Sequence, residues 1–158
     1  MAIEAPISKF KKNNVKIYIV LCVIATLFFG YDGYLSKYKW SRRYSFYEKH
    51  VIDGKPDNDM KFNQKSPPFF AGAALCLYAY YSLIKNRRLL ADENELIINN
   101  KQKISYDSIQ KINKTHFESK GYFIITYNKD GKEVDLKIND RTYDNLEDIL
   151  NLLVAKIT

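Results

Sequence analysis

The sequence predicts an α+β membrane protein. Two transmembrane helices form a hairpin, followed by a small antiparallel β-barrel or sheet that a C-terminal α-helix caps. Two uncharged apolar stretches, at 17–31 and 67–84, lie in the first half of the 158-residue chain. The second half is polar, and its short apolar runs are separated by turn-prone pairs before a final helical pattern. This asymmetry predicts a soluble module attached to a membrane anchor.

The first membrane span is expected at 15–35, after a basic N-terminal tail at 1–14. Lys16 and Asp32 are close enough to the ends of the span for their charged groups to reach the headgroups. A cleaved signal peptide is an alternative, because lysines precede the stretch. The stretch ends in bulky residues before Gly30, with no small-x-small cleavage pattern, so we expect an uncleaved anchor.

The second span is expected at 67–85. Its 18 uncharged residues would extend about 27 Å as a helix, close to the roughly 30 Å of a bilayer's hydrocarbon core. Ser66 and Pro67 are suitable for the start of this helix. A buried helix of a soluble core is the alternative, but such a helix normally keeps a polar face, and neither stretch has one. Cys22 and Cys76 fall inside the spans and are expected to be packing residues.

The connecting loop at 36–66 begins with interleaved aromatic and basic residues. Trp40, Tyr44, Tyr47 and Val51 follow helical spacing, which predicts an interfacial amphipathic helix that continues to 51. An aromatic belt followed by irregular loop is the alternative. The remainder of the loop is expected to be a polar linker. The residues expected at the membrane interface, on both sides, are Tyr34, Lys37, Tyr38, Lys39, Trp40, Arg42, Arg43, Tyr44, Lys85, Arg87 and Arg88.

Charge alone leaves the orientation of the hairpin open. Two spans place both termini on the same side, and basic residues flank the spans there, at 9–16 and in the KNRR run at 85–88. The connecting loop, however, carries eight basic and four acidic side chains. Most of the net charge of +7 lies beside the spans, where anionic headgroups attract it, so nucleic-acid binding is not expected.

The soluble domain is expected at 87–158. Six short β-rich runs end in turn-prone pairs, and the Asp130-Gly131 pair between two alternating runs indicates a β-hairpin. A helical pattern follows at 142–157, with one apolar face and Asp140 or Thr142 as the N-cap. These elements predict a small antiparallel sheet or open barrel that is covered by a helix.

Residues 89–98 (LLADENELII) and 103–112 (KISYDSIQKI) resemble the bacterial pleckstrin-homology-like domains. In that family a short strand and a polar turn precede an I-x-x-I pattern, whose positions Ile109 and Ile112 take here. The hairpin at 122–138 and the final helix also fit this fold. The resemblance implies a cytoplasmic domain, cytoplasmic termini and an inner (cytoplasmic) membrane location. It also implies seven strands, whereas six are evident, so the seventh is either hidden near 101–105 or absent.

No catalytic or cofactor-binding motif is evident, and we expect neither an enzyme nor a metal site. His50 and His116 have no ligand partner at helical or hairpin spacing, and Asp57-Asn58-Asp59 lacks the Gly and Glu of a calcium loop. Gly-rich phosphate loops and nucleophile elbows are also missing.

Function is expected to reside in a surface. The sheet edge formed by Lys101, Lys103, Ile104 and Tyr106 is the candidate, since an exposed edge can accept a partner strand. The alternative is that its two lysines only protect the edge from aggregation. We therefore expect a non-catalytic, membrane-anchored adaptor or scaffold that binds a protein partner or its own copies, together with anionic lipid headgroups. A small accessory subunit that contacts a larger complex through its spans and aromatic loop, or a module that binds anionic lipids, are the alternatives.

Overall fold

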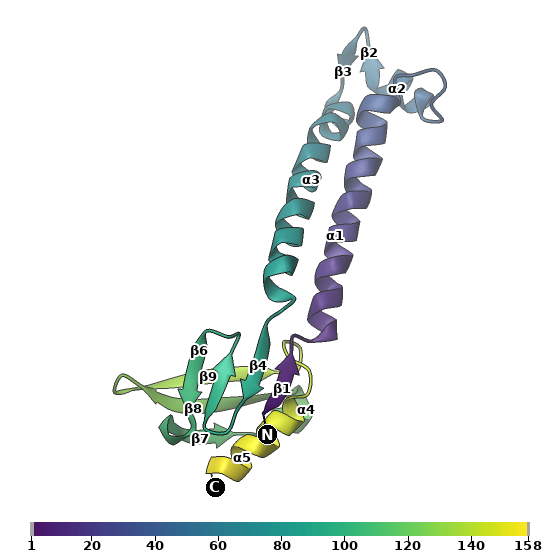
Figure 1. Cartoon of the computed structure of the whole chain (residues 1–158). Coiled ribbons are helices and arrows are strands. Elements are labelled where there is room, and N and C mark those ends of the chain that lie inside the picture. The colour runs from purple at the N-terminus through teal and green to yellow at the C-terminus, as the bar shows by residue number, and fades with distance from the viewer. Residues whose placement is uncertain (1, 158) are drawn as a thin grey trace. The chain divides into compact units, whose positions relative to one another are not determined.

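The computed structural model describes residues 2–157, which form two compact units (Figure 1). The first, here called the β unit, contains the residues up to Asn13 together with those from Ser82 onward. The second, here called the hairpin unit, is Asn14–Tyr81. The N-terminal segment, expected as a separate tail, therefore belongs to the β unit. The hairpin unit is an insertion in the sequence of that unit.

The β unit contains two antiparallel sheets. The larger has four strands in the order β1-β4-β5-β6, and the smaller has three in the order β7-β8-β9. No strand pairing joins the two sheets among the described residues, so they form an open pair of sheets and not a closed barrel. The strands are β1 (Ile3–Pro6), β4 (Arg88–Ala91), β5 (Glu95–Ile98), β6 (Gln102–Ser105), β7 (Ile109–Asn113), β8 (Tyr122–Lys129) and β9 (Lys132–Asn139).

The seventh strand comes from the N-terminus and not from the region near 101–105. The six expected strands are present as β4 to β9, and β6 already occupies residues 102–105. Strand β1 pairs with β4 from Ile3 opposite Ala91 to Pro6 opposite Arg88. Proline is tolerated here because β1 is an edge strand with only one neighbour. The alternating side chains of Ala5 and Ile7 enter the core, where both are buried.

The C-terminal helix α5 (Leu146–Ile157) supplies the expected apolar face. Leu146, Ile149, Leu150 and Leu153 are buried in one core with side chains from both sheets. The helix begins four residues later than expected, so neither Asp140 nor Thr142 is its cap. The segment before α5 instead forms backbone hydrogen bonds with residues 6–8, where an isolated β-bridge joins Ile7 to Tyr143.

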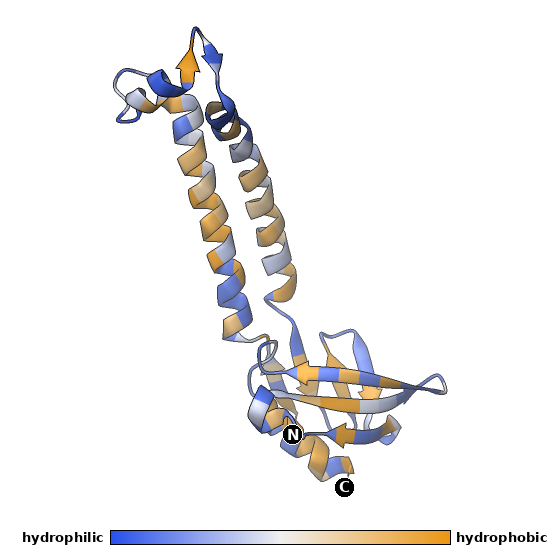
Figure 2. Cartoon of the chain, turned by 180° about the vertical axis from the view of Figure 1, so that it is seen from behind, coloured by the Kyte–Doolittle hydropathy of each residue, from blue (hydrophilic) through white to orange (hydrophobic). Residues whose placement is uncertain are grey.

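The hairpin unit consists mainly of two long helices, α1 (Lys9–Gly30) and α3 (Asn58–Ile84). The first residues of α1 and the last residues of α3 are assigned to the β unit. Both are long and apolar enough to cross a membrane, and Figure 2 shows hydrophobic residues along most of their length. In their most apolar windows only 6% and 11% of the residues are buried. These helices are therefore not the buried core helices that were considered as the alternative.

Both helices start earlier than the sequence patterns indicated, because each has a polar cap. The side-chain oxygen of Ser8 accepts a hydrogen bond from the Lys11 N–H (3.1 Å), and that of Asp57 accepts one from the Met60 N–H (2.9 Å). The helix expected from Pro67 thus begins at Asn58, with both prolines inside it.

The segment between the long helices, residues 31–57, is here called the head. It contains a π-helical turn η1 (Tyr31–Leu35), the short helix α2 (Tyr44–His50) and a hairpin of β2 (Val51–Ile52) and β3 (Lys55–Pro56). The expected continuous helix to 51 is wrong, since irregular turns separate η1 from α2. The expected linker is also partly ordered, because Asp53 and Gly54, with φ of 52° and 71°, form a two-residue hairpin turn.

Packing of the head against α3 compensates for the two prolines inside that helix. Pro68 has no N–H, so the carbonyl of Gln64 loses its helical partner, and the Tyr34 hydroxyl donates a hydrogen bond to it (2.6 Å). Gly33 lies against the backbone of Asn63, the residue whose carbonyl loses its partner at Pro67. A Cβ atom at Gly33 would be only 2.5 Å from that carbonyl oxygen. The absence of a side chain at this position lets the two chain segments approach closely.

Candidate functional site

The head is held together by an ion pair between a buried aspartate and an exposed arginine. Asp32 is 2% exposed, and its two carboxylate oxygens accept hydrogen bonds from Nε (3.0 Å) and Nη2 (2.8 Å) of Arg43. This two-point contact raises the pKa of Arg43, chiefly through the side-chain hydrogen bond to Asp32. Asp32, which was expected to reach the headgroups, is instead a structural anchor. Arg43, expected at the membrane interface, is its partner.

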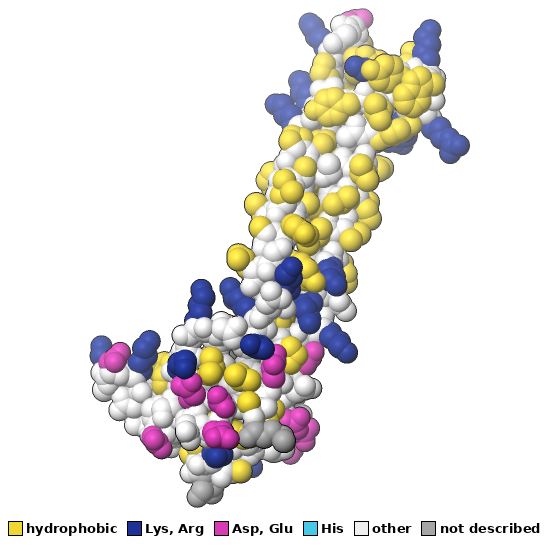
Figure 3. Space-filling model, viewed as in Figure 1, with side chains coloured by type: hydrophobic (Ala, Val, Ile, Leu, Met, Phe, Trp, Pro, Cys, Tyr) yellow, Lys and Arg dark blue, Asp and Glu magenta, His cyan; other side chains and the backbone are white. Residues whose placement is uncertain are grey.

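The other interface candidates on the head, apart from Tyr44, are exposed. Trp40 is 69% exposed and stacks on Tyr38 with ring centroids 5.7 Å apart, and Tyr34 is also exposed. Figure 3 shows hydrophobic side chains at this end of the hairpin unit, with lysine and arginine side chains around them. The exposed basic members are Lys37, Lys39 and Arg42, whereas Tyr44 is half-buried and stacks on Tyr47. Exposed aromatic rings beside cations are suited to the headgroup region of a bilayer.

The remaining interface candidates belong to the β unit. Lys85, Arg87 and Arg88 are exposed at the end of α3 and the start of β4. They line an open groove together with Glu4, which forms an ion pair with Arg88 (3.2 Å). Lys85 and Arg87 thus remain as candidate contacts for anionic groups.

Only some residues of the candidate interaction edge are exposed to solvent. Strand β6 ends the four-stranded sheet, with β5 as its neighbour, as expected for an edge. Lys101 and Lys103 are exposed, and Nζ of Lys103 lies 2.7 Å from a carboxylate oxygen of Glu95, which raises the pKa of Lys103. Ile104, however, is buried in the core, because it alternates with Lys103 across the sheet.

Tyr106 is likewise a core residue and not a contact residue. Its hydroxyl donates a hydrogen bond to the carbonyl of Asp92 (2.7 Å). Burial raises the pKa of Tyr106 to about 12, with smaller contributions from the charges of Asp92 and Glu95. The exposed side chains of the edge are therefore those of Lys101, just before β6, and of Lys103 and Ser105 within it.

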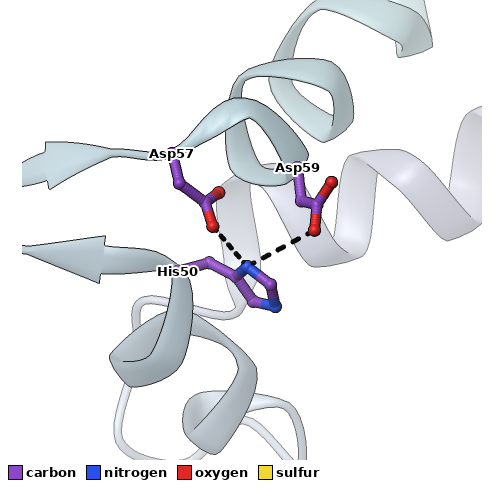
Figure 4. A group of neighbouring side chains, drawn as sticks. All are labelled: His50, Asp57 and Asp59. Carbon is purple, nitrogen blue, oxygen red and sulfur yellow. Dashed lines mark hydrogen bonds and ion pairs between the residues drawn. The ribbon is translucent and has the colours of Figure 1, made fainter.

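A group of possible metal ligands occurs in the head, where none was expected (Figure 4). Nδ1 of His50 lies 2.7 Å from Oδ2 of Asp57 and 3.7 Å from Oδ2 of Asp59. The three donor atoms lie within 4.8 Å of one another, and no other such group of three occurs among residues 2–157. The expectation that His50 has no partner is wrong. The His116 ring lies beside that of Tyr122, with centroids 5.3 Å apart and the planes tilted by 38°.

Hairpin register brings these residues together. Val51 pairs with Pro56, so His50 at the end of α2 is opposite Asp57 at the start of α3. The pKa of Asp57 is lowered, first by the hydrogen bond from the Met60 N–H and then by that from His50. One signal in the sequence could have revealed the proximity of His50 and Asp57. It is the turn-forming pair Asp53-Gly54, which follows two apolar residues and precedes Lys55-Pro56.

Comparisons with protein-family models, with curated proteins and with solved structures find no match to this chain. The geometry described above therefore carries the functional argument.

Proposed function

We propose that this chain is a non-catalytic adaptor anchored in the inner membrane, whose β unit binds a protein partner at the cytoplasmic face. The observation that carries the proposal is the pairing of β1 with β4, which ties both ends of the hairpin insertion to one unit. A folded module attached to the membrane at two points is held close to the bilayer surface. That placement suits a protein that presents a binding surface there.

The arrangement of strands supports a pleckstrin-homology-like fold for the β unit. This fold has seven strands and a closing helix, and the β unit has sheets of four and three strands packed with α5. Fold alone does not determine function, however.

The ionisable groups of the β unit support a non-catalytic role. Tyr106 and Tyr143 have raised pKa values, and in each the main cause is burial. Tyr143 donates a hydrogen bond to the Asn99 side chain (3.0 Å), as expected for a structural tyrosine. The ion pairs on the surface of the described part of the β unit, such as that of Arg88 with Glu4, contain no activated nucleophile or base.

Cytoplasmic termini are part of this proposal because the resemblance to the pleckstrin-homology-like domains implies them. Ion pairing does not change the balance of basic residues that sets orientation, since Arg43 of the head pairs with Asp32 and Arg88 of the β unit pairs with Glu4.

Cysteine labelling tests this orientation. Ile52 in the head is 69% exposed, and Lys129 lies at the exposed end of β8. In intact cells an impermeant maleimide should label Ile52→Cys, whereas Lys129→Cys should react only after the membrane is permeabilised. The reverse pattern would contradict the proposed orientation.

Site-specific crosslinking tests the interaction edge. A photo-crosslinking residue at the exposed Ser105, the last residue of β6, should capture a protein in native membranes, either another protein or a second copy of this chain. Lys101→Glu/Lys103→Glu should reduce this capture strongly. The matched control is Lys129→Glu/Lys132→Glu, which makes the same charge change at the β8–β9 turn. Equal capture in both double variants would show that the β6 edge is not the binding surface.

A further inference from the structure

We propose that His50, Asp57 and Asp59 form a binding site for a divalent transition-metal cation, with Zn²⁺ as the representative ion, on the head of the hairpin. This site is independent of the proposed partner-binding surface, because it belongs to the hairpin unit and the β6 edge to the β unit.

The donor set determines the class of metal. One imidazole nitrogen with two carboxylate oxygens suits Zn²⁺, Co²⁺ or Ni²⁺, whereas Ca²⁺ and Mg²⁺ prefer shells made of oxygen alone. The two carboxylates also supply negative charge that a divalent cation would balance. The group is therefore more than a cluster of acidic residues, since it includes the nitrogen ligand that transition metals favour.

The distances between donors suit a tetrahedral ion. Metal–ligand bonds of about 2.0–2.2 Å at tetrahedral angles place neighbouring donor atoms roughly 3.3 Å apart. The two distances from Nδ1 of His50, 2.7 Å to Asp57 and 3.7 Å to Asp59, lie on either side of this value. Figure 4 shows Nδ1 facing both carboxylates, so small side-chain shifts would bring all three donors onto one ion. Metal binding would require Nδ1 to be unprotonated, so its hydrogen bond to Asp57 would be replaced by the bond to the metal and any proton on Nδ1 would be released to solvent.

The ligands are held to different degrees, as expected of a site that keeps a coordination position open. The His50 side chain is 12% exposed and packs against Phe46, with ring centroids 4.2 Å apart. Asp57 is fixed by its hydrogen bond from the Met60 N–H. Asp59 is 75% exposed and can adjust to the ion, and a water molecule or a group from another molecule would complete the coordination.

Helix capping accounts for only part of this arrangement. The cap of α3 requires Asp57 alone, and the hydrogen bond from His50 would orient it. Neither interaction requires the carboxylate of Asp59 to converge on the same ring nitrogen at 3.7 Å. Binding of a cation accounts for all three positions, as would an ion pair of an imidazolium with both carboxylates, and the metal titration distinguishes the two.

The test uses the full-length chain without an affinity tag, in detergent micelles. Titration with Co²⁺, followed by visible absorption, and with Zn²⁺, followed by calorimetry, should show one ion bound per chain. His50→Gln and Asp59→Asn should each weaken binding by roughly 10-fold or more. Asp57→Asn should do the same while preserving the helix cap, because asparagine caps about as well as aspartate.

Two matched variants serve as controls. Asp53→Asn removes one carboxylate from the same head at a turn position with φ of 52°, a conformation that asparagine tolerates, and His116→Gln removes the other imidazole. Both should bind Zn²⁺ like the unmodified chain. The proposal is overturned if the unmodified chain binds no stoichiometric ion, or if His50→Gln binds as tightly as the controls. Circular dichroism of each variant verifies that a loss of binding is not a loss of folding.

Discussion

Replacing Gly33 by alanine should loosen the head from α3. The added Cβ atom would lie 2.5 Å from the carbonyl oxygen of Asn63 and 2.9 Å from the backbone nitrogen of Gln64. Both atoms are backbone, so no flexible side chain can move aside. The two segments would have to separate by roughly 0.9 Å to reach the 3.4 Å at which ordinary contact begins.

The expected cost follows from three terms. Overpacking of this kind costs about 1–3 kcal/mol. Separation of the segments also stretches the hydrogen bond from Tyr34 to Gln64, which contributes about 1 kcal/mol. The higher helix propensity of alanine, compared with glycine, offsets about 1 kcal/mol of this destabilisation. The net destabilisation of the head should thus be about 2 kcal/mol, or roughly 30-fold in the unfolding equilibrium.

Trp40 provides the assay, because it is the chain's single tryptophan and lies in the head. Its fluorescence during denaturation in mixed micelles should show a lower midpoint for Gly33→Ala than for the unmodified chain. The matched control is Gly72→Ala on α3, where an added Cβ meets nothing within 4 Å. Equal midpoints for the two alanine variants would refute the close-approach argument.

Three further predictions concern other parts of the chain. Ile7→Ala should destabilise the β unit by about 2–5 kcal/mol, because this side chain is 2% exposed, and amide exchange should accelerate in β4 and β8 as well as at the N-terminus. Faster exchange confined to the first residues would contradict it. Arg43→Gln should weaken the head by leaving Asp32 buried without its partner, and the added change Asp32→Asn should restore part of the loss, as a double-mutant cycle with Trp40 fluorescence would measure. Since the pKa of Tyr106 is raised from 10.0 to about 12, its contribution to stability is complete below pH 10 and is lost as the pH rises to 12. Alkaline denaturation of Tyr106→Phe, followed by circular dichroism, should lack this loss between pH 10 and 12.

Local patterns in the sequence were sufficient for most of the secondary structure. Most of the strands from β4 to β9 follow a period of two residues, apart from β7 with its bulge between Ile109 and Lys111, and the apolar face of α5 follows a period of 3.6 residues. These periods depend only on neighbours along the chain. The two long apolar helices follow from composition in the same way. Boundaries were less accurate where a polar cap such as Asp57 extends a helix beyond its apolar stretch.

Tertiary structure alone decided which distant segments meet. Ile3–Pro6 is too short and too ordinary to be recognised as a strand, and it becomes one because β4, more than eighty residues later, offers unpaired backbone groups and a core for Ile7. Likewise, Ile104 and Tyr106 were assigned to a surface from their sequence neighbours, but the sheet directs both into the core. His50 meets two carboxylates because a two-residue turn reverses the chain between them. Periodicity determines what each segment prefers to be, whereas the burial of one segment against another, which no local pattern records, determines where its side chains lie.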